Sequence, residues 1–426
     1  MYIFNKYNLL NFLICFIPLS LILGNLALNI NIILICLLGI HTYKKELFLI
    51  NNNLFYYLIY IFFFYLIFIT LINNYTKFER SELYLTNFYK SLFFLRYLFL
   101  FLIVNKLLEN KQLNIKMFFL SSGFLSAFLT IDIIIQIIFG VDLVGYEITK
   151  YRPSGFFGEE NIAGSYLQKF IIFFIFYFFI DHQNKKTIFY ILILFLIFLI
   201  AIFLTGNRMP FLLYIGSILI FFLLQKKFKQ IIFTIFFITL LVSYSIKFPL
   251  IERIDLQIKN FFNSSIEIIT KAPKVFANND IRIHFGTSGY LTHFNSGVQI
   301  WKKNKFFGHG LKSFPLNCKY SINQTCNTHP HNYFIELLVD TGIIGLFLIY
   351  FIFFVGLIKY TKYFFSFKKK LNKEILLSFP FFIIIFFEFF PIRSTGSFFT
   401  TSNSSIIFFF LAIFLNVEKI SLNYKK

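Results

Sequence analysis

Charged side chains are scarce in this 426-residue chain: they make up 14% of it, and only 19 residues are acidic against 40 lysines and arginines. Hydrophobic residues make up 58%, and the mean hydropathy is +0.73. Several apolar runs reach the ~20 residues with which a helix crosses a bilayer. A soluble domain does not have this composition, so the chain is predicted to be a polytopic membrane protein.

The formal net charge of +21 would suit a nucleic-acid-binding protein only if the cations formed one soluble basic face. Here the lysines and arginines mostly separate the apolar runs, which is typical of a membrane protein. We therefore expect the lipid bilayer, and no nucleic acid, as a partner.

The chain also lacks a strong internal repeat and a low-complexity linker. The first apolar run is followed at once by a second, so it is predicted to be a membrane span and not a cleaved signal peptide. Residues 1–426 are therefore expected to form a single all-α membrane domain of about twelve transmembrane helices. To within ~2–4 residues, these helices are 8–24, 26–41, 54–73, 91–108, 117–139, 162–180, 187–205, 209–225, 231–247, 333–359, 375–391 and 404–418.

Orientation follows from the lysines. Groups such as Lys44-Lys45 and Lys368–Lys370 lie in every second segment between the apolar runs, whereas the other short segments hold few cations. The positive-inside rule then places both termini in the cytoplasm. Two larger segments fall on the outer side, 140–161 between the fifth and sixth helices and 248–332 between the ninth and tenth. The second includes Ile251–Lys271, whose helical apolar spacing suits a helix on the membrane surface or one covering the mouth of the bundle.

Cysteines are few. Cys15 and Cys36 lie in apolar runs and are expected in the core. Cys318 and Cys326, eight positions apart in the long outer segment, are a candidate disulfide. A metal site with the nearby histidines is the alternative, but no Cys-x-x-Cys spacing supports it, and no metal is expected.

The charged residues Arg96, Asp132, Lys169 and Glu388 are among those that fall inside apolar runs. Intramembrane charges usually face a cavity or each other. Structural pairing is expected for all four, and Lys169 and Asp132, on adjacent predicted helices, are a candidate pair.

His331 and Asn332 stand where a polar segment meets the apolar run that starts at Tyr333. A titratable imidazole at the mouth of a membrane helix is a functional candidate, and a capping histidine without chemistry is the alternative. Nine residues separate Asn332 from Gly342, and Gly345 follows; the small size of these glycines indicates that another segment packs closely there. His329, two residues before His331, could share or take over its role.

Three segments on the predicted outer side thus carry the distinctive polar residues. The first runs from Tyr151 to Gly164, the second from Thr205 to Leu212, and the third from Phe306 through His331 to Gly345.

Together these segments resemble the O-antigen ligase and polymerase superfamily, and O-antigen ligase in particular, over about residues 140–360. The family signature is His-Asn, nine residues and Gly-x-x-Gly, which His331, Asn332, Gly342 and Gly345 match. Weaker family elements match Arg208 and Leu212; Gly308, Gly310 and Phe314; and Arg152, Gly155, Phe157 (one position late), Asn161 and Ala163. The chain departs from the pattern at Asp340, where Glu is common, and at Leu346.

The resemblance implies a glycosyltransferase of a bacterial inner membrane, with its active site on the periplasmic side and no cofactor. It would move a glycan from undecaprenyl pyrophosphate to an acceptor hydroxyl. The acceptor first expected is the lipid A core, which makes the reaction a step of lipopolysaccharide biosynthesis. A polysaccharide polymerase and a protein O-oligosaccharyltransferase are the alternatives within the superfamily. A flippase or transporter is the rival from another class; it should show two related halves and helices broken at the membrane midplane.

The chemistry of the residues agrees with such a transfer. His331, at a helix N-terminus and near arginines, is expected to stay neutral and to serve as the general base. Arg152 and Arg208 suit the departing pyrophosphate, because a guanidinium binds phosphate oxygens bidentately and stays charged. Arg282 and Lys312 are further candidate phosphate contacts, with solvated charges as the alternative. Cations of this kind would replace a divalent metal, which predicts metal-independent, inverting transfer.

Overall fold

The computed structural model describes residues 6–49, 54–77, 82–148, 152–181, 185–224, 229–230, 232–235, 289–318, 327–366, 373–391 and 393–423. Within these residues the chain is helical and contains no strand beyond one isolated bridge, Val141 to Glu147. The predicted all-α class is therefore confirmed.

The N-terminal helices follow the apolar runs with one correction. The expected helix 8–24 is broken, because Pro18 stands in the first turn of a new helix and cannot donate a backbone hydrogen bond to the preceding one. These elements are α1 (Lys6–Cys15), α2 (Ile17–Ile22), α3 (Asn25–Tyr43), η1 (Lys44–Phe48), α4 (Leu54–Lys77), α5 (Glu82–Glu109) and α6 (Ile115–Phe139).

The remaining elements include two that the apolar runs did not predict, α12 and α13. They are η3 (Gly155–Phe157), α7 (Ala163–Asp181), α8 (Lys185–Leu204), α9 (Arg208–Leu224), α12 (Gly289–Lys303), α13 (Phe314–Cys318), α14 (Tyr333–Ser366), α15 (Lys373–Glu388), α16 (Thr401–Leu415) and α17 (Val417–Asn423).

Six segments of the described chain are long and apolar enough to cross a membrane, which makes this a multi-pass membrane protein. They are Asn25–Phe48, Leu54–Asn73, Leu85–Glu109, Ile115–Phe139, Ala163–Ile180 and Tyr333–Ser366. The helices α8, α9 and α16 are apolar but shorter. The total of twelve spans stays a prediction, since most of the expected helix 231–247 and all of Ile251–Lys271 lie outside the described residues.

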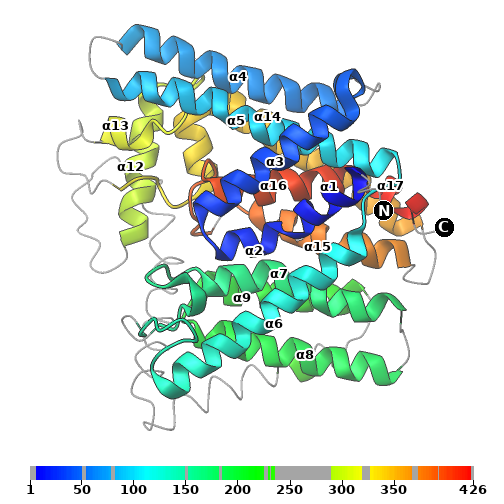
Figure 1. Ribbon diagram of the computed structural model, residues 1–426. Helices are drawn as coiled ribbons and strands as arrows, with labels where there is room; N and C mark the ends of the chain where they lie inside the picture. The colour runs from blue at the N-terminus through cyan, green and yellow to red at the C-terminus, as the bar shows by residue number, and fades with distance from the viewer. Residues whose placement is uncertain are drawn as a thin grey trace.

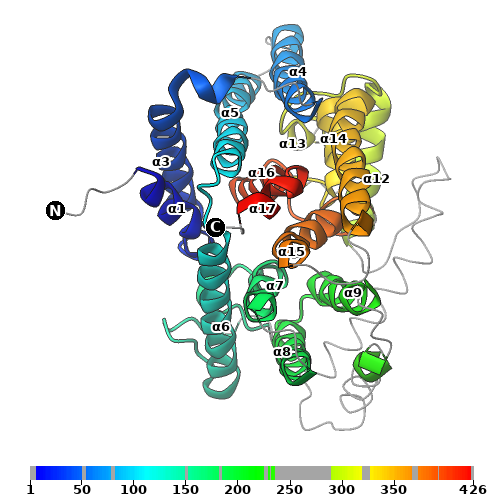
Figure 2. The same ribbon diagram turned by 90° about the vertical axis from the view of Figure 1, so that its right-hand side faces the viewer.

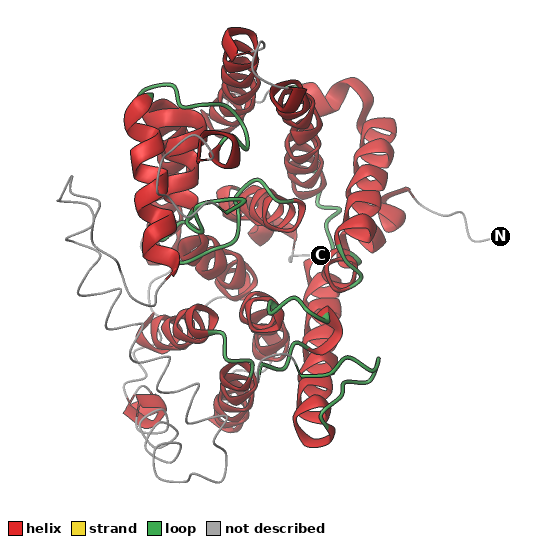
Figure 3. Ribbon diagram, turned by 90° about the vertical axis from the view of Figure 1, so that its left-hand side faces the viewer, coloured by secondary structure: helices red, strands yellow, loops and turns green. Residues whose placement is uncertain are grey.

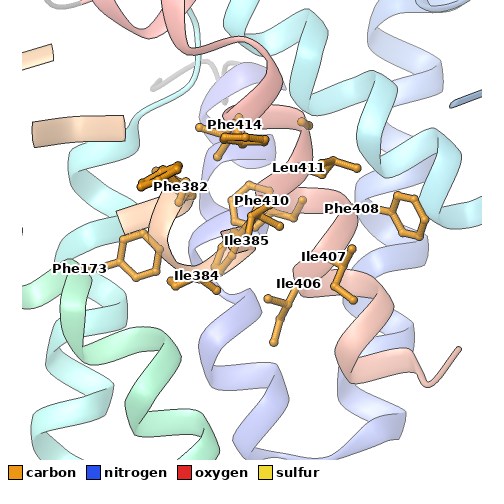
Figure 4. Packing of buried hydrophobic residues seen from close by; sticks show 14 of the residues in the cluster. Phe173, Phe382, Ile384, Ile385, Ile406, Ile407, Phe408, Phe410, Leu411 and Phe414 are labelled. Carbon is orange, nitrogen blue, oxygen red and sulfur yellow. The ribbon is translucent and has the colours of Figure 1, made fainter. Parts of the chain in front are cut away.

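The core is built around α15 and α16, which the other helices surround (Figure 2). Every residue from Ser404 to Leu415 is buried, as is every residue from Ile375 to Ile385. Aromatic rings from three helices meet here: the ring centroids of Phe173 and Phe410 lie 5.4 Å apart, and both pack near α15 (Figure 4). Such rings bury large apolar areas, which stabilises the centre of the bundle.

The bundle has two distinct ends. The first and last helices, α1 and α17, lie at one end, and α12 and α13 lie at the other (Figure 1). Figure 3 looks onto the second end and shows most of the helices end-on. His331 belongs to the second end, because it directly precedes α14 and its carbonyl accepts a hydrogen bond from Thr395 N, in the loop between α15 and α16.

Candidate functional site

Asn332 fixes the start of α14. Its Oδ1 accepts a hydrogen bond from Ile335 N at 2.9 Å, which caps the helix. Its Nδ2 donates to the carbonyls of Pro391 (2.8 Å) and Arg393 (2.9 Å). The side chain is 3% exposed. Asn332 therefore holds the helix start against the loop between α15 and α16.

Helix α14 is broken at Gly342, where φ is 67° and ψ is −170°. This conformation is open to glycine and hardly to any other residue. A Cβ at Gly342 would also lie 2.1 Å from the carbonyl oxygen of Phe306. The first half of the helix, residues 333–341, is thereby set off from the longer apolar half that follows.

The glycine-rich segment before α13 fills this break. His309 N donates to Val339 O at 2.9 Å and Gly310 N donates to Asp340 O at 2.8 Å, while Ile343 N donates to Lys305 O at 2.9 Å. The helix ends exposed by the break thus find backbone partners, which a helix buried in a membrane protein requires.

The glycines of the two motif elements form one junction. Gly308 and Gly310 have φ values of 73° and 88°, and a Cβ at Gly308 would lie 2.5 Å from Gly342 N. At Gly345 an added Cβ would lie 3.1 Å from the Tyr65 ring of α4, whose hydroxyl donates to Thr341 O at 2.9 Å. The close packing expected at Gly342 and Gly345 is therefore present, and the segment at 305–310 and α4 provide it.

Two carboxylates one helical turn apart are buried in the first half of α14. Glu336 accepts hydrogen bonds from Ser397 Oγ (2.5 Å) and Phe398 N (2.6 Å). Asp340 accepts from Lys312 N (2.8 Å) and Ser313 N (3.1 Å). These acids, which sequence reasoning did not assign a role, hold the loop before α16 and the segment before α13. Their spacing of four residues inside an apolar run was the signal for them.

His331 has a φ of 55°, which costs a residue other than glycine on the order of 1 kcal/mol. Its carbonyl accepts from Thr395 N at 2.8 Å, and its Nε2 lies 2.8 Å from Asn327 Nδ2. Burial lowers the pKa of His331, the charge of His293 lowers it further, and a backbone hydrogen bond with Thr395 opposes these effects. The lowered pKa favours the neutral form of the imidazole.

Two further histidines lie beside His331. The ring centroid of His329 is 4.1 Å away and that of His293 is 5.3 Å away. Burial, followed by the neighbouring His331, lowers the pKa of His329 to about 4. His293 comes from α12, whose apolar Phe294 and Trp301 share one helical face, a weak signal that sequence reasoning passed over.

Lys312 is the predicted cation that the structure brings to this end of α14. Its backbone nitrogen is held by Asp340, and its carbonyl accepts from Asn87 Nδ2 at 3.2 Å. Lys90 Nζ in turn donates to Asn87 Oδ1 at 3.3 Å. Burial and then the charge of Lys90 lower the pKa of Lys312, so two ammonium groups lie near each other and near His329.

The predicted residues Arg152, Asn161 and Arg208 lie on the two segments that lead to the start of α7 or pack against it. An added Cβ at Gly164 would lie 2.4 Å from Thr205 Oγ1, so α7 begins against the turn that leads into Arg208 and α9. Asn161 precedes α7. Arg152 lies three residues before Gly155, which has a φ of 53° and donates its N–H to Gln136 Oε1 at 2.9 Å.

A buried ion network links α7 to α15 and the loop after it. Lys169 Nζ lies 3.1 Å from Glu388 Oε1, and Arg393 Nη2 lies 3.0 Å from Glu388 Oε2. The candidate pair of Lys169 with Asp132 is therefore wrong, because Lys169 faces α15. Asp132 instead accepts a hydrogen bond from Leu143 N at 2.9 Å and orders the loop after α6.

Intramembrane Arg96 also has polar partners: its Nη2 donates to Tyr97 OH at 2.7 Å and to Thr401 Oγ1 at 3.4 Å. Cys318 is disulfide-bonded, and Cys15 and Cys36 are free thiols. The predicted partner Cys326 lies outside the described residues, as does Arg282. Among the residues described, no three His, Cys, Asp or Glu side chains are placed to hold a metal ion.

Fold and site together define a multi-pass membrane protein with a histidine of lowered pKa at one end of its helix bundle. Residues 170–350 match a protein-family model described as O-Antigen ligase. This match covers less than half of the chain, and it confirms the resemblance seen in the motifs. No curated protein matches the chain.

The matched region begins in α7, directly after Lys169. It contains Arg208, Lys312, His331 and the glycines of the broken helix α14. The match supports a membrane glycan-processing role and a glycosyltransferase-like enzyme.

Proposed function

We propose that the protein transfers a glycan from undecaprenyl pyrophosphate to an acceptor hydroxyl at the periplasmic face of a bacterial inner membrane. Ligation of O-antigen to the lipid A core of lipopolysaccharide is the first candidate reaction. The observation that carries the proposal is His331, whose pKa is lowered and which stands next to the capping residue Asn332 at the start of a buried half-helix inside the family-matched region. In this proposal, segments 140–161 and 248–332 are periplasmic and both termini are cytoplasmic.

His331 is proposed as the general base. With Asn327 Nδ2 donating, the lone pair of the neutral ring lies on Nε2. The acceptor hydroxyl would take the place of the Asn327 amide and give its proton to Nε2. Its oxygen would form a bond to the anomeric carbon as the bond from that carbon to the pyrophosphate breaks on the opposite face. The product has inverted configuration, and the lipid pyrophosphate leaves with the electron pair.

The departing pyrophosphate needs positive charge, which Arg152, Arg208, Arg282 and Lys312 are proposed to supply. The support for Lys312 is its fixed backbone beside Asp340 and its closeness to His329. The support for Arg152 and Arg208 is their place around the start of α7, which the ion network ties to the loop that binds His331.

The broken helix α14 is a feature that transporters share. In transporters, however, the unwound backbone is left open to coordinate ions, whereas here the freed N–H and C=O groups bond to residues 305–310. The break therefore supports a rigid site at one end of the bundle and does not favour a flippase.

Reconstitution with a lipid-linked glycan tests the proposal and separates ligase from polymerase. Lipid A core, a second lipid-linked glycan and an acceptor protein are offered in separate reactions. Product on lipid A core alone supports ligation, and product on the second lipid-linked glycan shows a polymerase. No product on any acceptor, from protein that is folded by its melting profile, contradicts the proposed transfer.

A further inference from the structure

A cavity of about 610 Å³ lies at the end of the bundle opposite to His331. The first turn of α6 lines it, and the last turn of α6 leads to the loop that contains Gly155. Because an α-helix rises 1.5 Å per residue, the length of α6 separates the two places by roughly 37 Å. Figure 1 shows the start of α6 beside α1 and α17. The cavity is therefore remote from the proposed transfer site.

The polar part of the cavity wall carries cations and amides. None of the described residues that line it is acidic, and its polar members are Asn8, Asn11, Lys111, Gln112, Asn114 and Lys116. A lysine ammonium binds phosphate as a point charge, and side-chain amides can donate hydrogen bonds to phosphate oxygens. A wall of this composition favours an anion.

The wall is preformed by hydrogen bonds between helices. Asn11 Nδ2 donates to Gln112 O at 2.7 Å, and Asn11 Oδ1 accepts from Asn114 N at 2.7 Å. Gln112 N donates to Leu107 O at 2.8 Å, which closes the end of α5 over Lys111. Binding would therefore require little ordering of the backbone, which preserves affinity.

The rest of the wall is apolar and continues into the membrane-spanning surface. Met117, Leu377 and Ile420 line it, and Met117 is 41% exposed at the start of the apolar helix α6. A free phosphate would use only the polar wall. A ligand that has a phosphate and a hydrocarbon chain would use both.

We propose that this cavity binds the phosphate-bearing head group of an anionic membrane lipid. Lys111 and Lys116 contact the phosphate, the side-chain N–H groups of Asn8 and Gln112 donate to its oxygens, and Met117 and Leu377 meet the first part of the acyl chains. Basic pockets between transmembrane helices on the cytoplasmic side bind such head groups, and the lysine distribution predicts that this end is cytoplasmic. The site is independent of the proposed glycan transfer.

The test measures lipid binding to the full-length protein in neutral detergent by native mass spectrometry and by the shift in melting temperature. The probes are phosphatidylglycerol, phosphatidylcholine and inorganic phosphate. The test variant is Lys111→Asn with Lys116→Gln. The control is Lys44→Asn with Lys45→Gln, which removes two exposed lysines from η1. Lys44 and Lys111 both have a positive φ, 46° and 57°, which asparagine tolerates. The two variants therefore change the backbone strain at that position in the same way.

We expect phosphatidylglycerol to bind the wild type and the control alike, and the test variant at least about tenfold more weakly, since two charge-assisted contacts are lost. Equal affinity of the test variant and the wild type would overturn the proposal. Equal binding of phosphatidylcholine, or equal protection by inorganic phosphate at the same phosphate concentration, would overturn the assignment to an anionic lipid. Lys116→Gln alone does not alter the turn at Lys111. This single variant replaces the double variant in the test if the double variant does not fold.

Discussion

Gly308 and Gly342 pack backbone against backbone, so that a Cβ at Gly308 would lie 2.5 Å from the amide nitrogen of Gly342. The two glycines thereby allow their segments to approach closely. Gly342 breaks helix α14, and Gly308 lies in the loop whose N–H and C=O groups bond to the freed backbone groups at the break. Because the first half of α14 begins right after His331, this junction sets where the proposed base stands.

Replacing Gly342 by asparagine is expected to destabilise the fold by about 3 kcal/mol or more, because the side chain meets the Phe306 carbonyl and the backbone is strained. The melting temperature in detergent measures it. Gly140→Asn is the matched control: Gly140 has a φ of 83° but open space around it. Similar melting temperatures for the two variants would contradict the junction.

Glu388→Gln should be strongly destabilising, by about 3–5 kcal/mol, because it leaves buried Lys169 and Arg393 without their counter-charge. Asp132→Asn is the comparison, since Asn can still accept the hydrogen bond from Leu143 N. Denaturation of both variants in the same detergent tests the pairing that the structure shows. A larger loss for Asp132→Asn would restore the pairing expected from the sequence.

The glycine junction at Gly342 and the ion pairs of Glu388 show which features could be predicted from the sequence and which could not. Apolar runs predicted most of the helices, and the spacing from His331 to Gly342 and Gly345 predicted the close packing at these glycines, because both are patterns within one segment. The partner of Lys169 is Glu388, far along the chain, and the residues that fill the break at Gly342 precede it by more than thirty positions. Such contacts depend on tertiary packing, so side-chain type alone favoured the nearer Asp132.

The helix α12 shows a different limit. It is short and amphipathic, so its sequence contains no long apolar run. It nevertheless places the ring centroid of His293 5.3 Å from that of His331. A search for helical spacing in polar segments, and not only for spans, would have found it.

Glycan transfer is expected to continue in excess EDTA. The proposed charge stabilisation comes from guanidinium and ammonium groups, such as Lys312 beside Lys90, and not from a metal ion. The rate of product formation by the reconstituted protein, with and without EDTA, measures this. Loss of transfer that magnesium or manganese restores would refute the cationic clamp.

Stability should fall on mild acidification. The unfolded chain takes up protons on histidine near pH 6.5, whereas the folded protein resists protonation of His329 until about pH 4. The free energy of unfolding should therefore decrease as the pH falls from 6.5 towards 4. His329→Gln should flatten this part of a stability profile measured by chemical denaturation. An unchanged slope would mean that His329 is not protected from protonation in the folded state.

The pH dependence of transfer distinguishes the two neighbouring imidazoles. The pKa of His331 is lowered from 6.5, so the neutral base persists below that pH, and the acid limb of kcat/KM should lie below pH 6.5. His331→Ala should reduce transfer by about 10²–10⁴-fold and remove this limb, while the melting temperature at pH 7 confirms folding. His329→Gln should keep both transfer and the limb. An acid limb that survives in His331→Ala, or one that disappears in His329→Gln, would assign the base to another residue.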